Sequence, residues 1–117
     1  MPLTIGIDIG GSTTKIVGPQ DGQMISPIRV RADDPVTSAY GAFGKFLAEN
    51  KLDIEHICQV MFTGVGSSFL QGDIYGIPSR KVDEFQAIGQ GGRFISGCDR
   101  AVVVSMGTGT AFLWASP

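Results

Sequence analysis

Two runs of strand-forming residues meet at a glycine pair in Gly6-Ile7-Asp8-Ile9-Gly10-Gly11-Ser12-Thr13-Thr14-Lys15-Ile16-Val17. Residues 3–9 and 12–18 are rich in Ile, Val and Thr, which is typical of β-strands. A Gly-Gly pair between such runs indicates a two-residue hairpin turn, because the primed turns that join twisted strands require positive φ angles. The sequence therefore predicts a β-hairpin with Gly10-Gly11 at its tip.

The predicted tip carries groups that suit phosphate and magnesium. Backbone N–H groups in a glycine-rich turn can form a concave anion site, and hydroxyl and ammonium groups add donors. Mg²⁺ prefers oxygen ligands such as the carboxylate of Asp8, which lies just before the turn. The candidate phosphate ligands are Gly10, Gly11, Ser12, Thr13, Thr14 and Lys15, and the candidate magnesium ligand is Asp8. An ordinary tight hairpin whose polar residues face water is the alternative interpretation.

Two commoner phosphate sites do not fit this stretch. A Walker A loop needs Gly-Lys-Ser/Thr followed by a helix, and a Rossmann fingerprint needs its last glycine to open a helix. Here β-branched residues continue after the glycines, so neither pattern is present in residues 6–17.

The length and composition indicate one soluble domain with a hydrophobic core. The chain has 117 residues, 43% of them hydrophobic, and a net charge of −2, which argues against nucleic acid or an anionic membrane as a partner. No apolar run is long enough to span a membrane, and the N-terminus lacks the pattern of a signal peptide. Cys58 and Cys98 are expected to be buried thiols in a reducing compartment, and His56 has no nearby partner for a zinc site. We therefore expect a cytoplasmic protein.

The middle of the chain alternates strands and helices. Residues 23–31 read as a third strand in which Pro27 indicates an edge or a bulge. Asp34-Pro35 opens a helix that ends at Asn50. Residues 56–63 form an apolar strand, and the turn at 64–68 after it is a candidate substrate wall or only a link to a short helix at 67–70. Residues 72–81 read as a loop.

The last third repeats the design of the first hairpin. Asp83 caps a helix over about 84–96, where Glu84 serves either to compensate the helix dipole or as a general base. Its glycines indicate close contact with another part of the backbone. A strand at 101–106 then leads to a glycine-threonine tip and a further strand at 111–114. Two such tips could hold a polyphosphate from both sides.

These residues resemble the actin-like ATPase and sugar-kinase superfamily, and within it the type II pantothenate kinases. The resemblance rests on IDIGGSTTK at 7–15, VDEFQA at 82–87 and VSMGTGT at 104–110, and it runs over essentially the whole chain. It implies a lobe of mixed sheet and helices in the order β-β-β-α-β-α-β over 1–104, with 105–117 as the start of a second lobe. Because family members have a complete second lobe that holds the nucleoside and makes the homodimer, we expect this piece alone to be inactive.

The resemblance also assigns roles. The first tip would hold the phosphates of ATP, and Asp8 would hold Mg²⁺ through water. Glu84 would be the catalytic base that activates the hydroxyl of pantothenate for attack on the γ-phosphate, a phosphorylation that belongs to coenzyme A biosynthesis. The residues expected to line the place where pantothenate meets phosphate are Ser105, Gly107, Thr108, Gly109 and Thr110.

Other functions stay open. The first motif also resembles activators of 2-hydroxyacyl-CoA dehydratases, which hold an iron–sulfur cluster between subunits, and a buried Cys58 would make such a cluster less favourable. An N-acetylhexosamine kinase shares the fold and the hairpin. A non-catalytic lobe that associates through an open sheet edge at 111–115 is an alternative of a different class.

Overall fold

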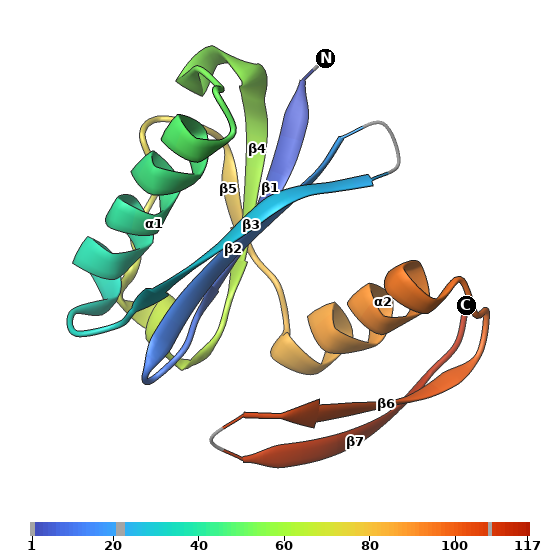
Figure 1. Ribbon diagram of the computed structural model, residues 1–117. Coiled ribbons are helices and arrows are strands. Elements are labelled where there is room, and N and C mark those ends of the chain that lie inside the picture. The colour runs from blue at the N-terminus through green and yellow to red at the C-terminus, as the bar shows by residue number, and fades with distance from the viewer. Residues whose placement is uncertain (1, 21–22, 108) are drawn as a thin grey trace. The chain divides into compact units, whose positions relative to one another are not determined.

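A computed structural model describes residues 2–20, 23–107 and 109–117 of the chain (Figure 1). The chain divides into two compact units, Met1–Lys81 and Val82–Pro117, and each is described by itself. The boundary expected at 104/105 falls inside strand β6 of the second unit. No helix in the described ranges combines the length and the apolar character needed to cross a membrane.

A five-stranded mixed sheet forms the first unit, with the strand order β3-β2-β1-β4-β5. Its strands are β1 (Leu3–Ile9), β2 (Thr13–Gln20), β3 (Gln23–Arg31), β4 (Ile57–Thr63) and β5 (Ser79–Lys81). The first three strands pair antiparallel, and β4 lies parallel to both β1 and β5. This arrangement confirms the predicted α/β class with a mixed sheet, and it places β3 at an edge, as Pro27 indicated.

Helix α1 (Pro35–Glu49) begins and ends where the sequence indicated. The Asp34 carboxylate accepts a hydrogen bond from the Thr37 backbone N–H at 2.8 Å. Hydrogen bonds from the Thr37 side chain and backbone hold the pKa of Asp34 below its ordinary value. At the other end, Asn50 Nδ2 donates to the Phe46 carbonyl at 2.9 Å. Both ends of the helix therefore have partners for backbone groups that would otherwise lack them.

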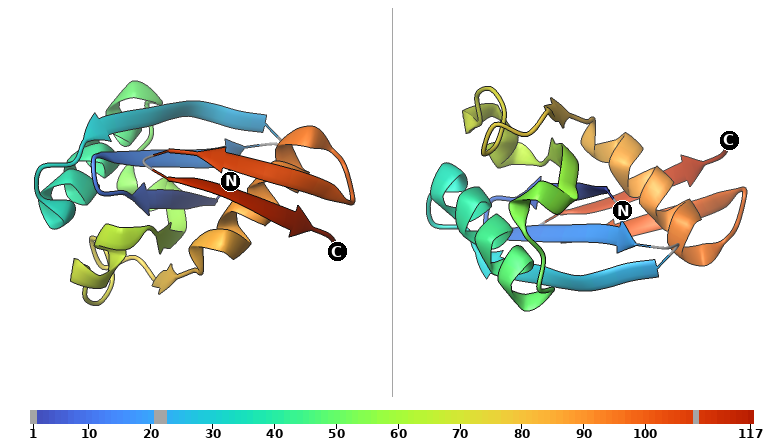
Figure 2. Two further views of the ribbon diagram at one scale, coloured as in Figure 1. Left: turned by 90° about the horizontal axis from the view of Figure 1, so that it is seen from below. Right: turned by 90° about the horizontal axis from the view of Figure 1, so that it is seen from above.

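Helix α1 covers one face of the sheet, which we call the covered face; the other is the open face (Figures 1 and 2). Along β1 the isoleucines alternate with half-buried residues, so every second side chain enters the core. Each fully buried Ile or Phe contributes about 1.5–3 kcal/mol. The central core side chains are Ile5, Ile7, Ile9, Ile16, Ala39, Ala42, Phe43, Phe46 and Val60. This core fixes the sheet, and with it the side chains of the open face.

Thr14 lies on the covered face with its side chain fully buried. Among the residues that the structure describes, its Oγ1 has no hydrogen-bond partner. A buried hydroxyl without a partner costs about 1–3 kcal/mol, so Thr14→Val should raise the free energy of unfolding by about 1 kcal/mol. Urea denaturation measures this change, with Thr13→Val as the control on the opposite face. A loss of stability in Thr14→Val would contradict the assignment of an unsatisfied hydroxyl.

Three local features differ from expectation. The tip turn uses no positive φ at Gly10 or Gly11, and β2 starts at Thr13, so the turn is centred one residue later than predicted. Residues 79–81, expected in a loop, form β5 at the sheet edge; their Ser-Arg-Lys sequence lacks the apolar pattern of a strand. Short 3₁₀ helices occur at η1 (Ile54–His56) and η2 (Val65–Phe69), the latter close to the short helix predicted at 67–70.

The prediction of buried cysteines was wrong, because Cys58 and Cys98 are both exposed and free. Pairing between β1 and β4 shifts from Leu3–Ile57 to Thr4–Gln59. Cys58 is therefore the extra residue of an irregularity in β4, which turns it out of the alternation that buries Ile57 and Val60.

The second unit is helix α2 (Glu84–Ser96) with a hairpin of β6 (Ala101–Met106) and β7 (Thr110–Ala115). Asp83 caps the helix by accepting from the Gln86 N–H at 3.0 Å, as predicted. A Cβ on Gly92 would lie 2.5 Å from Val103 Cγ2, and one on Gly89 would lie 3.5 Å from the Ala115 Cβ. The helix glycines therefore allow α2 to pack closely against the β6–β7 hairpin. The sequence predicted such a close contact but not its partner.

Candidate functional site

The open face of the first unit brings Asp8 and Lys15 together. They are direct cross-strand partners on β1 and β2, and Thr63 on β4 is the partner of Asp8 on its other side. Lys15 Nζ lies 3.6 Å from Asp8 Oδ2, and the two side chains are 51% and 36% exposed. A carboxylate and an ammonium that both reach solvent can take a hydrated cation and an anionic oxygen, respectively.

The turn beside this pair offers fewer backbone donors than the sequence indicated. The N–H of Gly10 donates to the Thr13 carbonyl at 2.9 Å, so it is not free for a ligand. A Cβ on Gly10 would lie 2.7 Å from that same carbonyl oxygen, which explains the glycine. Gly11 and Ser12 are exposed, and within the described ranges their N–H groups have no acceptor in the protein. These two N–H groups are the backbone hydrogen-bond donors that the tip can offer to a phosphate.

The predicted hydroxyl ligands separate into two sets. Thr13 shares the open face with Lys15, two residues along the same strand, and is half-buried. Thr14 points to the opposite, covered face and is fully buried. We therefore leave the Thr14 hydroxyl out of the proposed phosphate site and keep Ser12, Thr13 and Lys15.

The turn after β4 packs directly against Asp8. Gly64 has a φ of +97°, and a Cβ there would clash with the Ile9 carbonyl oxygen and lie 2.6 Å from Asp8 Oδ1. Val65 follows it, with Cγ2 3.9 Å from the position of a Cβ on Gly11. The Ser67 hydroxyl donates to the Gly64 carbonyl at 2.6 Å and is buried, so it holds the turn rather than facing a ligand. The turn proposed from sequence as a substrate wall thus adjoins both the carboxylate and the tip.

Glu84 is exposed in the first turn of α2. In the described part of the chain its carboxylate has neither a hydrogen bond nor an ion pair. The second tip follows β6, where the Gly107 N–H donates to the Gly109 carbonyl at 2.8 Å. Gly107, Gly109 and Thr110 are exposed and Ser105 is half-buried, whereas Thr108 lies outside the described residues. That the two tips meet at one ligand stays a prediction.

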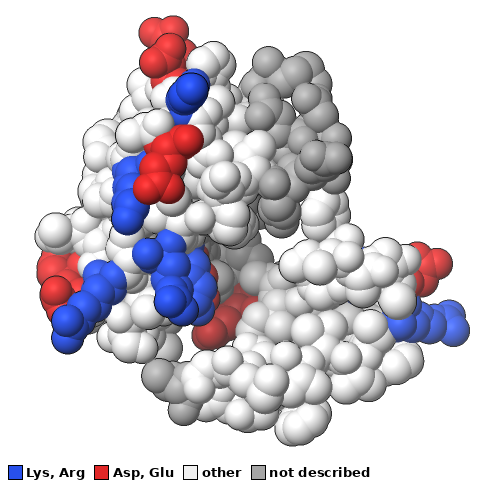
Figure 3. All heavy atoms as spheres, in the orientation of Figure 1, with Lys and Arg blue, Asp and Glu red and all other residues white. Residues whose placement is uncertain are grey.

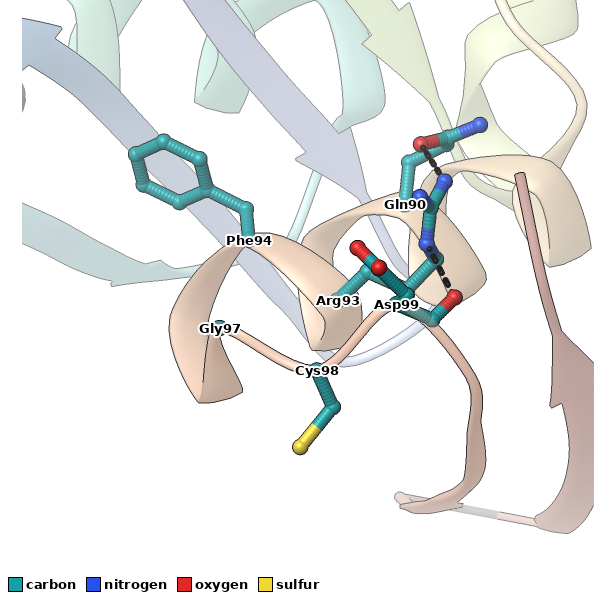
Figure 4. A pocket seen from close by; sticks show the side chains of 6 residues that line it. All are labelled: Gln90, Arg93, Phe94, Gly97, Cys98 and Asp99. Carbon is teal, nitrogen blue, oxygen red and sulfur yellow. Dashed lines mark hydrogen bonds between the residues drawn. The ribbon is translucent and has the colours of Figure 1, made fainter.

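A shallow pocket of about 340 Å³ lies at the end of α2 and contains none of the predicted site residues (Figure 4). Arg93 donates from Nη1 to Gln90 Oε1 at 3.2 Å and from Nε to the Asp99 carbonyl at 3.0 Å. Its guanidinium therefore joins the helix to the loop that follows. The pocket is lined by Gln90, Arg93, Phe94, Gly97, Cys98 and Asp99. We interpret it as a structural feature of the helix end.

No group of three or more His, Cys, Asp or Glu side chains that could hold a metal ion occurs among the residues that the structure describes. Asp8 is a single carboxylate, so it could hold Mg²⁺ only together with waters and the oxygens of a bound phosphate. Mg²⁺ sites that act on nucleotides commonly have this composition. The residues present therefore fit a magnesium ion only if a bound phosphate completes its set of ligands.

Comparison with known proteins defines the fold. Neither a protein-family model nor a curated protein matches the sequence. Among solved structures, component A of the (R)-2-hydroxyglutaryl-CoA dehydratase of Acidaminococcus fermentans matches with a TM-score of 0.72 and 20% identity, over 94% of this chain and 45% of that one. The activator of the 2-hydroxyisocaproyl-CoA dehydratase from Clostridium difficile, with bound ADPNP, matches with a TM-score of 0.69 and 17% identity, over 96% and 46%.

The ROK hexokinase from Thermus thermophilus matches with a TM-score of 0.65 and 11% identity, over 97% of this chain and 46% of that one. The chain thus spans less than half the length of each of these three proteins. Identities this low show the fold alone, and that fold is the actin-like ATPase fold that the sequence motifs predicted.

Proposed function

We propose that this chain binds Mg·ATP and supplies the phosphate and magnesium site of an ATP-dependent kinase whose acceptor is pantothenate. The observation that carries the proposal is the solvent-accessible Asp8–Lys15 pair beside the N–H groups of Gly11 and Ser12, which have no acceptor among the described residues. An actin-like ATPase fold supports it, and one protein of this fold binds ADPNP.

Each group has a chemical task in this proposal. Phosphoryl transfer depends mainly on positioning and on neutralising the charge of the phosphates, and bound Mg²⁺ supplies much of that neutralisation. Lys15 and the N–H groups of Gly11 and Ser12 hold phosphate oxygens, while Asp8 orients the waters of the ion. The hydroxyl oxygen of the acceptor bonds to the γ-phosphorus while the bond between that phosphorus and the ADP oxygen breaks. Glu84 accepts the proton that the hydroxyl loses. Ser105, Gly107, Thr108, Gly109 and Thr110 are proposed to line the acceptor side.

Pantothenate is proposed as the acceptor on the sequence resemblance of residues 82–87 and 104–110 to type II pantothenate kinases. A homodimer and a cytoplasmic location stay predictions. The second candidate is an activator of a 2-hydroxyacyl-CoA dehydratase, which is favoured by the structural likeness to two such proteins. The exposure of Cys58 removes its expected burial as an argument against an iron–sulfur cluster.

A transfer assay tests the acceptor. The protein as its gene encodes it is incubated with Mg²⁺ and γ-labelled ATP, and with pantothenate, N-acetylglucosamine or glucose in parallel. We expect the label in phosphopantothenate and not in either sugar. Label in a sugar phosphate would contradict the pantothenate proposal, whereas ATP hydrolysis without acceptor and with protein-bound iron would favour the activator.

A further inference from the structure

Four polar side chains form a compact cluster on the open face of the first unit, next to the tip. The pairing of β2 with β3 sets Lys15 directly opposite Arg29 and Thr13 directly opposite Arg31. The residues between them, Thr14 and Val30, are partners on the covered face. We call Thr13, Lys15, Arg29 and Arg31 the cross-strand cluster.

Among the described residues, the three cations of the cross-strand cluster have acidic partners only at Lys15 and Arg31. Lys15 and Arg29 are like charges directly opposite each other, an arrangement that destabilises a sheet. Asp8 partners Lys15 at 3.6 Å, and Asp33 lies 3.9 Å from Arg31 with both side chains 88% exposed, a pair that contributes little. Arg29 has no ion pair in the described part of the chain. An anion between the two strands would offset this repulsion.

Backbone bonding holds the cluster beside the tip. The N–H of Ala32, the residue after Arg31, donates to the Ser12 carbonyl at 3.0 Å. The end of β3 therefore lies along the turn whose Gly11 and Ser12 N–H groups find no acceptor in the part of the chain that the structure describes. A ligand held by those N–H groups would lie next to Thr13 and Arg31, because these two residues are the cross-strand pair that directly follows the tip.

We propose that Arg29 and Arg31, together with Lys15 and Thr13, bind the terminal phosphates of the triphosphate whose remaining phosphates contact the tip. This inference rests on the proposed function. Guanidinium groups suit the task because they form paired hydrogen bonds with phosphate oxygens. Figure 3 shows Lys and Arg side chains gathered over the first unit in a surface that also carries acidic groups. Three cations in one small cluster suit a short polyphosphate better than a long nucleic acid, in a chain whose net charge is −2.

Calorimetric titration of the chain with ATP, ADP and inorganic tripolyphosphate, each with Mg²⁺, tests the inference. Arg29→Gln and Arg31→Gln should each weaken ATP and tripolyphosphate about tenfold, the effect of losing one hydrogen bond to a charged group, and should weaken ADP less. The control is Lys45→Gln on the exposed side of α1, which changes the net charge equally. Arg29→Lys should give an intermediate affinity, because lysine keeps the positive charge but cannot form the paired hydrogen bonds of a guanidinium. Urea midpoints show whether each variant is folded.

The outcomes separate this inference from the proposed function. If wild type binds ATP and both arginine variants bind it as tightly as Lys45→Gln does, the inference is overturned and the proposed function stands. If wild type binds tripolyphosphate in an arginine-dependent way but no nucleotide, the anion site stands and the proposed function fails. If wild type binds neither, both are overturned.

Discussion

Glu84→Gln is expected to lower the rate of phosphoryl transfer by about 10²- to 10⁴-fold, the range for the loss of a general base. Glutamine keeps the size of the side chain and its place in the first turn of α2, but it cannot accept the hydroxyl proton of the acceptor. The dissociation constant for Mg·ATP should stay within about twofold, since Glu84 is not among the proposed phosphate ligands. The rate is measured with pantothenate and γ-labelled ATP on the protein as its gene encodes it.

The neighbouring residue provides the matched control. Asp83→Asn removes one carboxylate beside Glu84 but keeps an oxygen that can accept from the Gln86 N–H at the helix start. We expect this variant to retain most of the activity. Loss of ATP binding in Glu84→Gln, or equal loss of activity in both variants, would assign Glu84 a structural role.

Asp8→Asn is expected to abolish the dependence of ATP binding on Mg²⁺. Wild type should bind ATP about tenfold or more tightly with Mg²⁺ than with a chelator, a difference that needs the Asp8 charge. Asparagine also releases Lys15 from its ion pair at 3.6 Å, so metal-free ATP should bind the variant at least as well as wild type. Calorimetric titration with and without Mg²⁺ measures both effects.

Glu55→Gln is the control for Asp8→Asn, because Glu55 is an exposed acid in η1 and the change in net charge is the same. It should keep the full magnesium dependence. If Asp8→Asn also keeps the magnesium dependence, the assignment of Asp8 as the magnesium ligand is contradicted.

The elements with strong local patterns could be predicted from the sequence. Helix α1 follows from Asp34-Pro35 at its start and Asn50 at its end, and α2 from Asp83 and its apolar spacing. The first hairpin follows from two β-branched runs around glycines. In each case the deciding interactions join residues only a few positions apart, so the local sequence is enough to predict the element.

The features that depend on strand register could not be predicted in this way. The irregularity between β1 and β4 exposes Cys58, and the one-residue shift of the turn sets which threonine faces the core. A shift of one residue moves every side chain to the other face of a strand. The pairing of Lys15 with Arg29 has the same origin, because it joins residues whose opposition is fixed only by the β2–β3 ladder.

The proximity of Gly64 to Asp8 could not be predicted from local sequence either, since 55 residues (9–63) separate the two along the chain. The signal was present in part, because a glycine directly after an apolar strand suggests a close approach or a positive φ, and Gly64 shows both. Because β4 pairs parallel with β1, the turn at Gly64 lies beside the Asp8 carboxylate.

The most direct measurement is an amide chemical-shift titration of the ¹⁵N-labelled chain with the Mg²⁺ complex of a non-hydrolysable ATP analogue. Binding at the proposed site would move the amide signals of Gly11, Ser12 and Lys15 first and furthest, with a smaller response at Gly64. Saturable shifts confined to the α2 end around Arg93, or no shifts at millimolar analogue, would contradict a triphosphate site at the β1–β2 tip.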